Sequence, residues 1–144
     1  MQVKLRKVHP EATIPQYATA GASGLDLHAR IVHEIYLQPG VRFTCPTGIA
    51  IELPCGYEAQ VRPRSGMASK HGVTVLNSPG TVDSDFRSEI SVVLINHGDV
   101  AYKVCPGDRI AQIVIAPVIR ASIVQAEILG ETIRGDGGFG STGV

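Results

Sequence analysis

Two polar segments in the middle of the chain contain residue types that could bind an anion and move a proton. At 63–66, the Arg64 guanidinium, the Ser65 hydroxyl and backbone N–H groups converge at a predicted helix start, an arrangement that can bind an anion. At 81–87, Asp83 and Asp85 follow a Pro-Gly turn, and one of these carboxylates could act as a general base. The alternative interpretations are a capped helix beside a solvated arginine and an ordinary polar turn.

Two further segments could contact a ligand. Gln112 is a polar amide inside an apolar run, so it either satisfies buried backbone groups or reaches a ligand. Residues 134–144 contain five glycines in eleven residues; they match dinucleotide-binding and phosphate-loop patterns only in part, because no helix can follow. They form either a flexible tail or a lid over a nucleotide, with Arg134 and Phe139 as its contacts.

The composition of the chain excludes several classes of protein. Lys and Arg number 13 and Asp and Glu also 13, so the excess positive charge of a nucleic-acid binder is missing and no such partner is expected. The three cysteines show no CxxC spacing, so no disulfide framework is predicted. The five histidines do not have the spacing of metal ligands, so no zinc site formed by protein side chains is predicted. No run approaches the ~20 apolar residues of a membrane span, so we expect a soluble, cytoplasmic protein without a membrane partner.

Short strands must position these residues. Alternating patterns at 49–53 and 57–62 predict strands, and denser apolar runs at 90–95 and 110–115 predict strands buried on both faces. A β-branched stretch continues over 118–128. Because Pro-Gly and Gly-Asp turns separate the runs, the 144 residues predict one all-β domain, a sandwich or a barrel.

One short helix is predicted within this β-rich chain. Ser65 can cap it, residues 67–70 can form it, and Gly72 can end it behind Lys70 and His71. The predicted organisation is a β domain over 1–133 and a flexible, glycine-rich C-terminal arm over 134–144.

Taken in order, five segments resemble the motifs of the trimeric dUTP diphosphatase (dUTPase) family. One motif alone would mean little, but the ordered set is highly specific. The motifs are Ala20-Gly-Ala-Ser-Gly-Leu-Asp-Leu-His-Ala29, Arg62-Pro-Arg-Ser-Gly-Met-Ala68, Gly80-Thr-Val-Asp-Ser-Asp-Phe-Arg87, Gly107-Asp-Arg-Ile-Ala-Gln112 and Arg134-Gly-Asp-Gly-Gly-Phe-Gly-Ser-Thr-Gly143.

The resemblance implies a fold, an assembly and a reaction. The implied fold is a jelly-roll-like β barrel or sandwich, and the implied assembly is a homotrimer whose active sites are shared between subunits, each closed by one chain's glycine-rich tail. The implied reaction is hydrolysis of dUTP to dUMP and pyrophosphate with Mg²⁺, which keeps uracil out of DNA and supplies dUMP for dTMP synthesis. Mg²⁺ would be held mainly by the triphosphate and water, with support from Asp26 through a metal-bound water.

The resemblance also assigns roles to residues of this chain. Asp83 is the implied general base for the water that attacks the α-phosphorus. Arg64, Ser65 and Gln112 are implied to bind the phosphate chain, and Gly66 would allow its close approach. These donors would act by being fixed in place before negative charge develops.

The other implied contacts recognise the nucleoside or close the site. The uracil edge would be contacted by Asn77, Gly80, Thr81 and Val82. Phe86 would pack on the deoxyribose, and Ser91 would add a backbone contact. In the tail, Phe139 would stack on uracil and Arg134 would bind the γ-phosphate, while Gly140, Ser141 and Thr142 would bind the phosphates. Two positions depart from the family pattern: Phe86 stands where tyrosine is commoner, and Ser88 where glycine is frequent, which affects expected sugar discrimination.

Three other functions fit part of this pattern. A dCTP deaminase would share the fold but release ammonia instead of pyrophosphate. A nucleotide-sensing protein would keep the pocket and signal to a regulatory protein partner. A structural trimer with a disordered tail would require all five motifs to be coincidental.

Overall fold

The computed structural model describes residues 1–141 and residue 143, so the prediction for Thr142 lies outside the described residues. Within them the chain forms eleven strands and one helix. The elements are β1 (Lys4–Lys7), β2 (Leu25–His28), β3 (Ile35–Leu37), β4 (Arg42–Pro46), β5 (Ile49–Glu52), β6 (Tyr57–Arg62), α1 (Ser65–His71), β7 (Val73–Val75), β8 (Gly80–Val82), β9 (Ser91–Asn96), β10 (Tyr102–Val104) and β11 (Arg109–Pro117).

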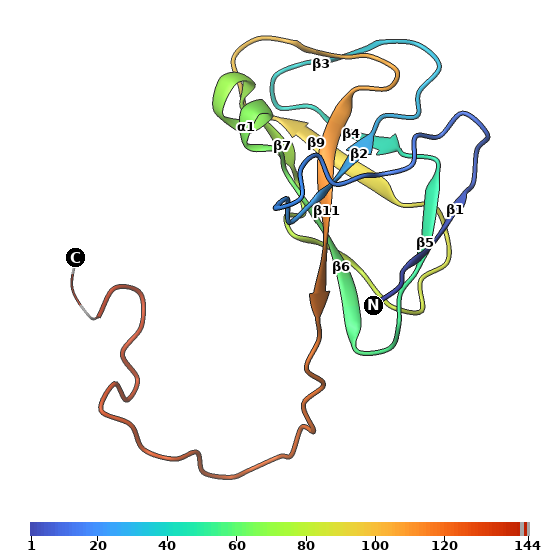
Figure 1. Ribbon diagram of the computed structural model, residues 1–144. Coiled ribbons are helices and arrows are strands. Elements are labelled where there is room, and N and C mark those ends of the chain that lie inside the picture. The colour runs from blue at the N-terminus through green and yellow to red at the C-terminus, as the bar shows by residue number, and fades with distance from the viewer. Residues whose placement is uncertain (142, 144) are drawn as a thin grey trace.

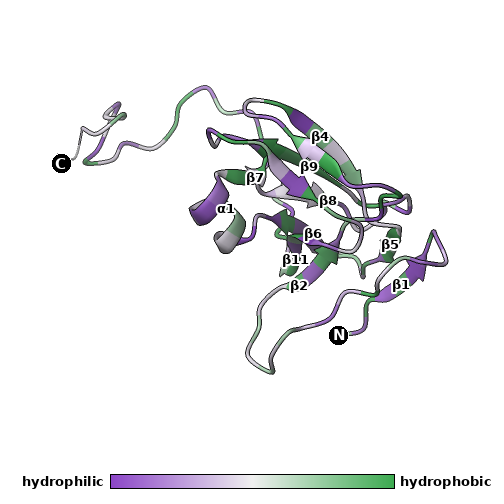
Figure 2. Ribbon diagram, turned by 90° about the horizontal axis from the view of Figure 1, so that it is seen from above, coloured by the Kyte–Doolittle hydropathy of each residue, from purple (hydrophilic) through white to green (hydrophobic). Residues whose placement is uncertain are grey.

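Antiparallel sheets enclose one hydrophobic core (Figure 1). The larger sheet has the order β2-β11-β6-β8 and the smaller one the order β4-β9-β7, while β1 pairs with β5 and β3 with β10. Figure 2 shows hydrophobic segments along β7 and β9 and hydrophilic ones along β1 and α1. The predicted all-β fold with one short helix is confirmed. No helix in the described part of the chain has the length and apolar character needed to cross a bilayer.

The burial of individual strands differs in part from the sequence prediction. In β6, Ala59 and Val61 are buried and Arg62 is exposed, as alternation predicts. In β9, Val92 and Leu94 are buried but Ser91 is exposed, so the prediction of a strand buried on both faces was wrong. An antiparallel sheet packs one face on the core and leaves the other uncovered within a single chain.

The helix α1 is longer than predicted and begins differently. Ser65 is its first residue and not its cap; Arg64 occupies the N-cap position in extended conformation, and no side chain caps the end. Gly72 ends the helix as predicted, with φ 68°, and its N–H reaches the carbonyls of Met67 and Ala68. Because αL geometry favours glycine, this end is determined by the sequence.

The chain after β11 leaves the body of the molecule (Figure 1). The β-branched stretch at 118–128 has the composition of a strand, but the described residues from 118 onward form no strand and are almost all exposed. Ile119 is 94% exposed and Ile123 is 89% exposed. Among the described residues, the last backbone hydrogen bond to the body of the molecule is that of the Val118 N–H to the Gly56 carbonyl, at 2.8 Å, and a strand requires such bonds along its length.

Candidate active site

One end of the larger sheet gathers polar side chains from three strands. Gln112 on β11 lies between Asp26 on β2 and Arg62 on β6 in the pairing register. Their neighbours Leu27 and Val61 are buried in the core. Since successive side chains point to opposite faces, Asp26, Gln112 and Arg62 share the outer face of the sheet.

Asp26 holds two arginines at this end of the sheet. Its Oδ1 lies 3.2 Å from Arg64 Nε, and its Oδ2 lies 3.2 Å from Arg109 Nη1. Arg64 Nη1 also donates to the Arg109 backbone carbonyl at 3.1 Å. A guanidinium with several fixed partners loses little freedom when it binds a further anion. Asp26 therefore orients Arg64 at the start of α1.

Gln112 is fixed between two loops. Its Nε2 donates to the Pro63 carbonyl at 3.0 Å, which ties β11 to the residue preceding Arg64. On the other side, a Cβ added at Gly24 would overlap the Gln112 Oε1 atom. The absence of a side chain at Gly24 therefore makes room for the Gln112 amide.

Replacing Gly24 by alanine should displace the Gln112 amide and lower turnover about tenfold, the loss of roughly 1.4 kcal/mol of transition-state stabilisation. Gly21→Ala is the matched control, because a Cβ there meets nothing within 4 Å. Steady-state kinetics of both variants make the comparison. Equal kcat values for the Gly24 and Gly21 variants would show that Gln112 does not depend on Gly24.

Sequence reasoning missed three residues of this cluster: Gly24, His28 and Arg109. The imidazole of His28 is beside the cluster, and its Nδ1 is buried with no hydrogen-bond partner in the described structure. Burial lowers the pKa of His28, against the opposing charge of Asp26. The available signal was spacing, since His28 lies two residues from Asp26 on the same strand face.

A loop at 76–79 connects β7, in the smaller sheet, to β8, at the edge of the larger sheet. Gly80 is buried, and a Cβ there would lie 3.3 Å from both Asn77 Nδ2 and Val61 Cβ, so the Asn77 amide lies over Gly80. Thr81 is exposed, while Val82 is buried. The Leu76 N–H donates to the Val93 carbonyl in β9 at 2.8 Å, which joins the start of this loop to β9, the strand that begins at Ser91. The residues of the β7–β8 loop and of β8 are thus close together in the chain and in space.

Asp83 directly follows β8 and is exposed. It lines a polar cavity of about 280 Å³ together with Tyr57, Glu58, Asp85 and Arg120. The Phe86 N–H donates to the Asp83 carbonyl at 3.2 Å, which closes the turn and leaves the Phe86 side chain 40% exposed. The Asp83 carboxylate is therefore open to water and to a ligand.

Asp83 and the Arg64 cluster lie at opposite ends of β6. Val82 pairs with Ala59 near one end of β6, whereas Gln112 pairs with Arg62 at the other end. The four residue steps from Glu58 to Arg62 span about 13 Å. One chain therefore brings Arg64 and Gln112 together but does not bring Asp83 to them.

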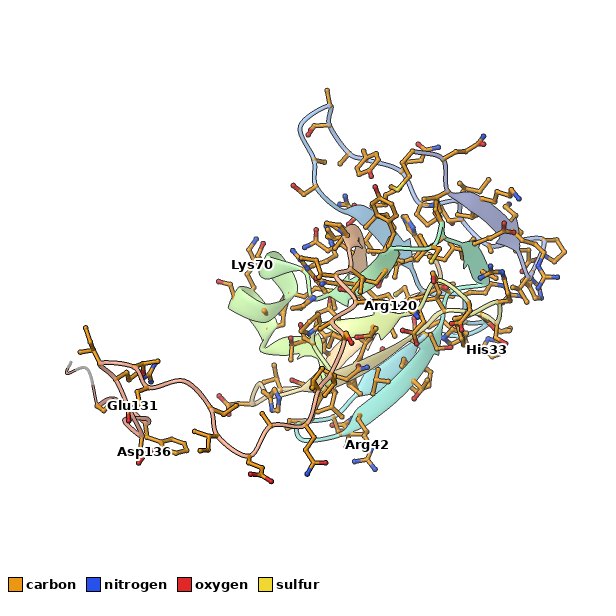
Figure 3. The ribbon with its side chains drawn as sticks, turned by 90° about the horizontal axis from the view of Figure 1, so that it is seen from below. His33, Arg42, Lys70, Arg120, Glu131 and Asp136 are labelled. Carbon is orange, nitrogen blue, oxygen red and sulfur yellow. The ribbon has the colours of Figure 1, made fainter. Side chains whose placement is uncertain are left out.

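The C-terminal tail lies away from both groups. Glu131 and Asp136 are well separated from Lys70 on α1 (Figure 3). Arg134 Nε donates to the Gly137 carbonyl at 2.7 Å, a contact within the tail. Phe139, Gly140 and Ser141 are exposed. The predicted tail contacts are thus not made to the chain's own body.

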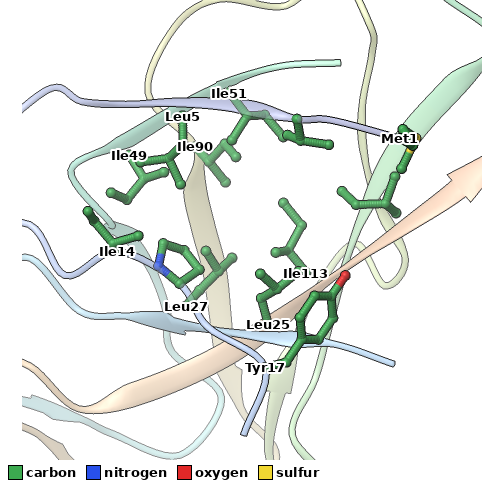
Figure 4. A pocket seen from close by; sticks show the side chains of 13 residues that line it. Met1, Leu5, Ile14, Tyr17, Leu25, Leu27, Ile49, Ile51, Ile90 and Ile113 are labelled. Atoms are coloured by element: carbon green, nitrogen blue, oxygen red, sulfur yellow. The ribbon is translucent and has the colours of Figure 1, made fainter. Parts of the chain in front are cut away.

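A separate apolar groove lies between β1 and β2 (Figure 4). It measures about 360 Å³, and its lining includes Leu5, Leu25, Ile51 and Ile113. These side chains come from both the β1-β5 pair and the larger sheet. Apart from Tyr17 and the N-terminal Met1, the lining consists of aliphatic side chains, so the groove is mainly an apolar surface.

The described residues bring no three His, Cys, Asp or Glu side chains together in a metal-binding geometry. The carboxylate beside Arg64 and Arg109 is Asp26, and each of its oxygens already faces a guanidinium. Mg²⁺ usually keeps several waters and takes one or two carboxylates together with substrate phosphates. This donor set fits Mg²⁺ only when the ion is carried by a polyphosphate.

Comparison with known proteins decides the family. A family model described as dUTPase matches residues 10–143. The chain belongs to the dUTPase family. The resemblance predicted from the five motifs is confirmed.

The dUTPase relatives match over almost the whole chain. The deoxyuridine 5'-triphosphate nucleotidohydrolase of Nautilia profundicola is 53% identical over 143 residues, covering 99% of each chain. That of Chlamydia pneumoniae is 59% identical over 131 residues, covering 90% of each. Among solved structures, the Staphylococcus bacteriophage 80alpha dUTPase with dUPNHPP has a TM-score of 0.90 at 22% identity, covering 99% of each chain. A phage phi11 dUTPase variant, described as coordinating a structural Mg(II) ion, has a TM-score of 0.80 at 20% identity, covering 89% of this chain and 98% of its own.

Proposed function

We propose that the protein hydrolyses dUTP to dUMP and pyrophosphate. The observation that carries the proposal is that Arg64 and Gln112 form one preorganised group of donors. Asp26 holds Arg64 by an ion pair, and Gln112 donates to the carbonyl of Pro63, the residue before Arg64. Curated relatives 53% and 59% identical are named for this activity. Such donors favour a polyphosphate whose charge grows in the transition state.

The proposed active site needs more than one chain. About 13 Å of β6 separates the level of Asp83 from that of the phosphate donors, so Asp83 must act with the Arg64 group of another copy. The exposed tail of a further copy would close the site. This supports the homotrimer, in which each site combines residues of different subunits.

The arm at 118–133 and the apolar groove support the same assembly. The arm exposes large apolar side chains that the body of its own chain leaves uncovered: Ile119, Ile123, Val124, Ile128, Leu129 and Ile133. The groove between β1 and β2 is lined mainly by apolar side chains, among them the half-buried Leu5 and Leu25. Burying both kinds of surface would stabilise subunit association by roughly 25 cal/mol per Å². We therefore treat 118–133 as the connection between the β domain and a lid at 134–144.

Deleting residues 118–144 should abolish the trimer, because it removes the apolar surface of the arm. Deleting only 134–144 is the matched control and should leave the trimer intact. Light scattering coupled to size-exclusion chromatography distinguishes the two masses. A stable trimer lacking 118–144 would show that the arm does not hold the subunits together.

The chemistry follows from the proposed positions. The Asp83 carboxylate takes a proton from a water molecule whose oxygen forms a bond to the α-phosphorus. The bond from that phosphorus to the bridging oxygen breaks, and pyrophosphate leaves with the bridging oxygen. Arg64, Ser65 and Gln112 bind phosphate oxygens throughout, while Gly66 keeps the approach open.

Mg²⁺ would enter on the triphosphate, where it neutralises negative charge as the reaction proceeds. Asp26 would support it through a bound water, because each carboxylate oxygen has a second lone pair beside its arginine contact. The remaining contribution of Asp26 is to hold Arg64 and Arg109 in place.

The β7–β8 loop and β8 would select the base. The Asn77 amide and the backbone of Gly80, Thr81 and Val82 would pair with the donors and acceptors of the uracil edge. Cytosine would leave buried polar groups unpaired, which is costly, and the methyl group of thymine would have no room.

Other residues would read the sugar and close the site. Phe86 is expected to pack on the deoxyribose and Ser91 to add a backbone contact. From the tail, Phe139 would stack on uracil while Arg134, Gly140 and Ser141 bind phosphates; the same role for Thr142 stays a prediction.

Incubation with each deoxynucleoside triphosphate and Mg²⁺ tests the proposal. We expect dUMP and pyrophosphate from dUTP and little product from the other nucleotides. Ammonia release from dCTP would instead indicate a deaminase, and tight dUTP binding without turnover would indicate a sensor. The cellular role that follows is removal of dUTP from DNA precursors and supply of dUMP for dTMP synthesis.

A further inference from the structure

The helix α1 carries the phosphate-binding residues, yet it is weakly anchored by its own side chains. Met67 is its one buried residue, and the other six are exposed. At the N-terminal end, the Arg64 carbonyl accepts the N–H groups of Met67 and Ala68, both at 3.1 Å. A surface helix usually buries a whole apolar stripe, so something other than apolar packing must fix the direction of α1.

The C-terminal end of α1 is fixed by close contact between backbones. A Cβ at Gly98 would overlap the His71 carbonyl oxygen, and one at Gly72 would lie 2.6 Å from the Gly98 nitrogen. The His97 N–H donates to the Gly72 carbonyl at 2.9 Å. Only a residue without a side chain fits at Gly98, because carbon atoms cannot approach oxygen so closely.

Asn96 holds the partner side of this contact. It is fully buried, and its Nδ2 donates to the carbonyls of Leu37 and Val100, both at 2.8 Å. Its Oδ1 accepts the Gly98 N–H at 2.8 Å. A buried amide with all these bonds made is rigid, since breaking any one leaves an unpaired polar group. The loop that contacts α1 is therefore fixed to the core.

A side-chain contact adds to this connection. The rings of His71 and Tyr102 lie 4.9 Å apart at 50°, which links the last residue of α1 to β10. The seven residues of the helix span about 10 Å between this contact and Ser65. A shift at one end of a rigid helix is transmitted to the other end.

We infer that Asn96 and Gly98 are positioning residues for the reaction: they fix α1 from its C-terminal end and so place Arg64, Ser65 and Gly66 against the phosphates. The inference rests on the proposed function. Neither residue touches substrate. They act through the backbone contact with Gly72 and His71, and misplacing reacting groups by 1 Å can cost about 10²-fold in rate.

The test is Gly98→Ala, with Asp99→Ala as the matched control in the same loop, where the side chain is exposed. In the trimer, kcat for dUTP should fall about 30-fold for Gly98→Ala, while KM changes less than about threefold because the base and sugar are bound by the β7–β8 region. Amide hydrogen exchange over residues 64–72 should become about tenfold faster. Asp99→Ala should match the parent in all three measurements.

A second pair of variants, with smaller structural changes, tests the inference if Gly98→Ala does not fold. His71→Ala removes the ring contact with Tyr102, and Lys70→Ala removes a neighbouring exposed side chain. We expect kcat to fall about threefold for His71→Ala alone. A lower melting temperature with parental kcat in Gly98→Ala, or equal kcat in the His71 and Lys70 variants, would overturn the inference.

The outcomes separate this inference from the proposed function. If the parent protein does not release pyrophosphate from dUTP, the proposed function fails, and exchange over 64–72 still measures the connection between Gly98 and α1. If the parent is active and Gly98→Ala is equally active, the positioning role fails while the function stands.

Discussion

Replacing Asp83 by asparagine should remove turnover, with a fall in kcat of about 10³-fold, within the range that a general base contributes. The amide keeps the size of the carboxylate but cannot accept a proton from water. Binding of dUTP should be nearly unchanged, because the β7–β8 loop and the residues proposed to bind the phosphates are untouched. Pyrophosphate release and calorimetric titration with a non-hydrolysable dUTP analogue measure the two quantities separately.

Asp85→Asn is the matched control for this prediction. Asp85 lies in the same turn, is exposed and lines the same cavity as Asp83. It should retain parental activity. Loss of turnover in Asp85→Asn with parental activity in Asp83→Asn would transfer the role of base to the second carboxylate.

Deleting residues 134–144 should lower kcat by at least about 10²-fold while leaving the trimer and its melting temperature unchanged. The described residues of the tail are almost all exposed and make no hydrogen bond to the β domain, so removing the tail costs little stability. It would remove the ring over uracil, the Arg134 contact and the shielding from water that a closed lid supplies. Steady-state kinetics and thermal unfolding provide the measurements.

A deletion of residues 143–144 alone serves as its control, since no contact with substrate is proposed for either residue. That shorter deletion should behave as the parent. If removal of 134–144 left kcat intact, the tail would be no lid, and Phe139 and Arg134 would have no part in catalysis.

Local sequence signals predicted the elements well where the chain itself supplies the packing partner. Alternation in 57–62 predicted the buried Ala59 and Val61, and Gly72 predicted the helix end. Signals failed where the partner lies elsewhere. The apolar residues at 118–128 have strand character, but they form no strand in the part of the chain that the structure describes.

The residue types of the site were predictable, but their contacts were not. Spacing and the family motifs singled out Arg64, Gln112 and Asp26. Their contacts depend on the register between β2 and β11, which lie more than 80 residues apart in the sequence. A shift of this register by one residue would turn every side chain of the strand to the other face of the sheet. The contact between Gly24 and Gln112 depends on the same register. The roles of the tail and of Asp83 stay predictions.

The distance along β6 has a genetic consequence. If each site takes its carboxylate from one subunit and its cationic donors from another, then mutations at Asp83 and at Arg64 affect residues that different subunits supply to the same site. An Asp83 variant and an Arg64 variant would each be inactive alone. In a cell that makes both, some mixed trimers would contain sites that combine an intact Asp83 from one chain with an intact Arg64 from the other, and activity would be partly restored.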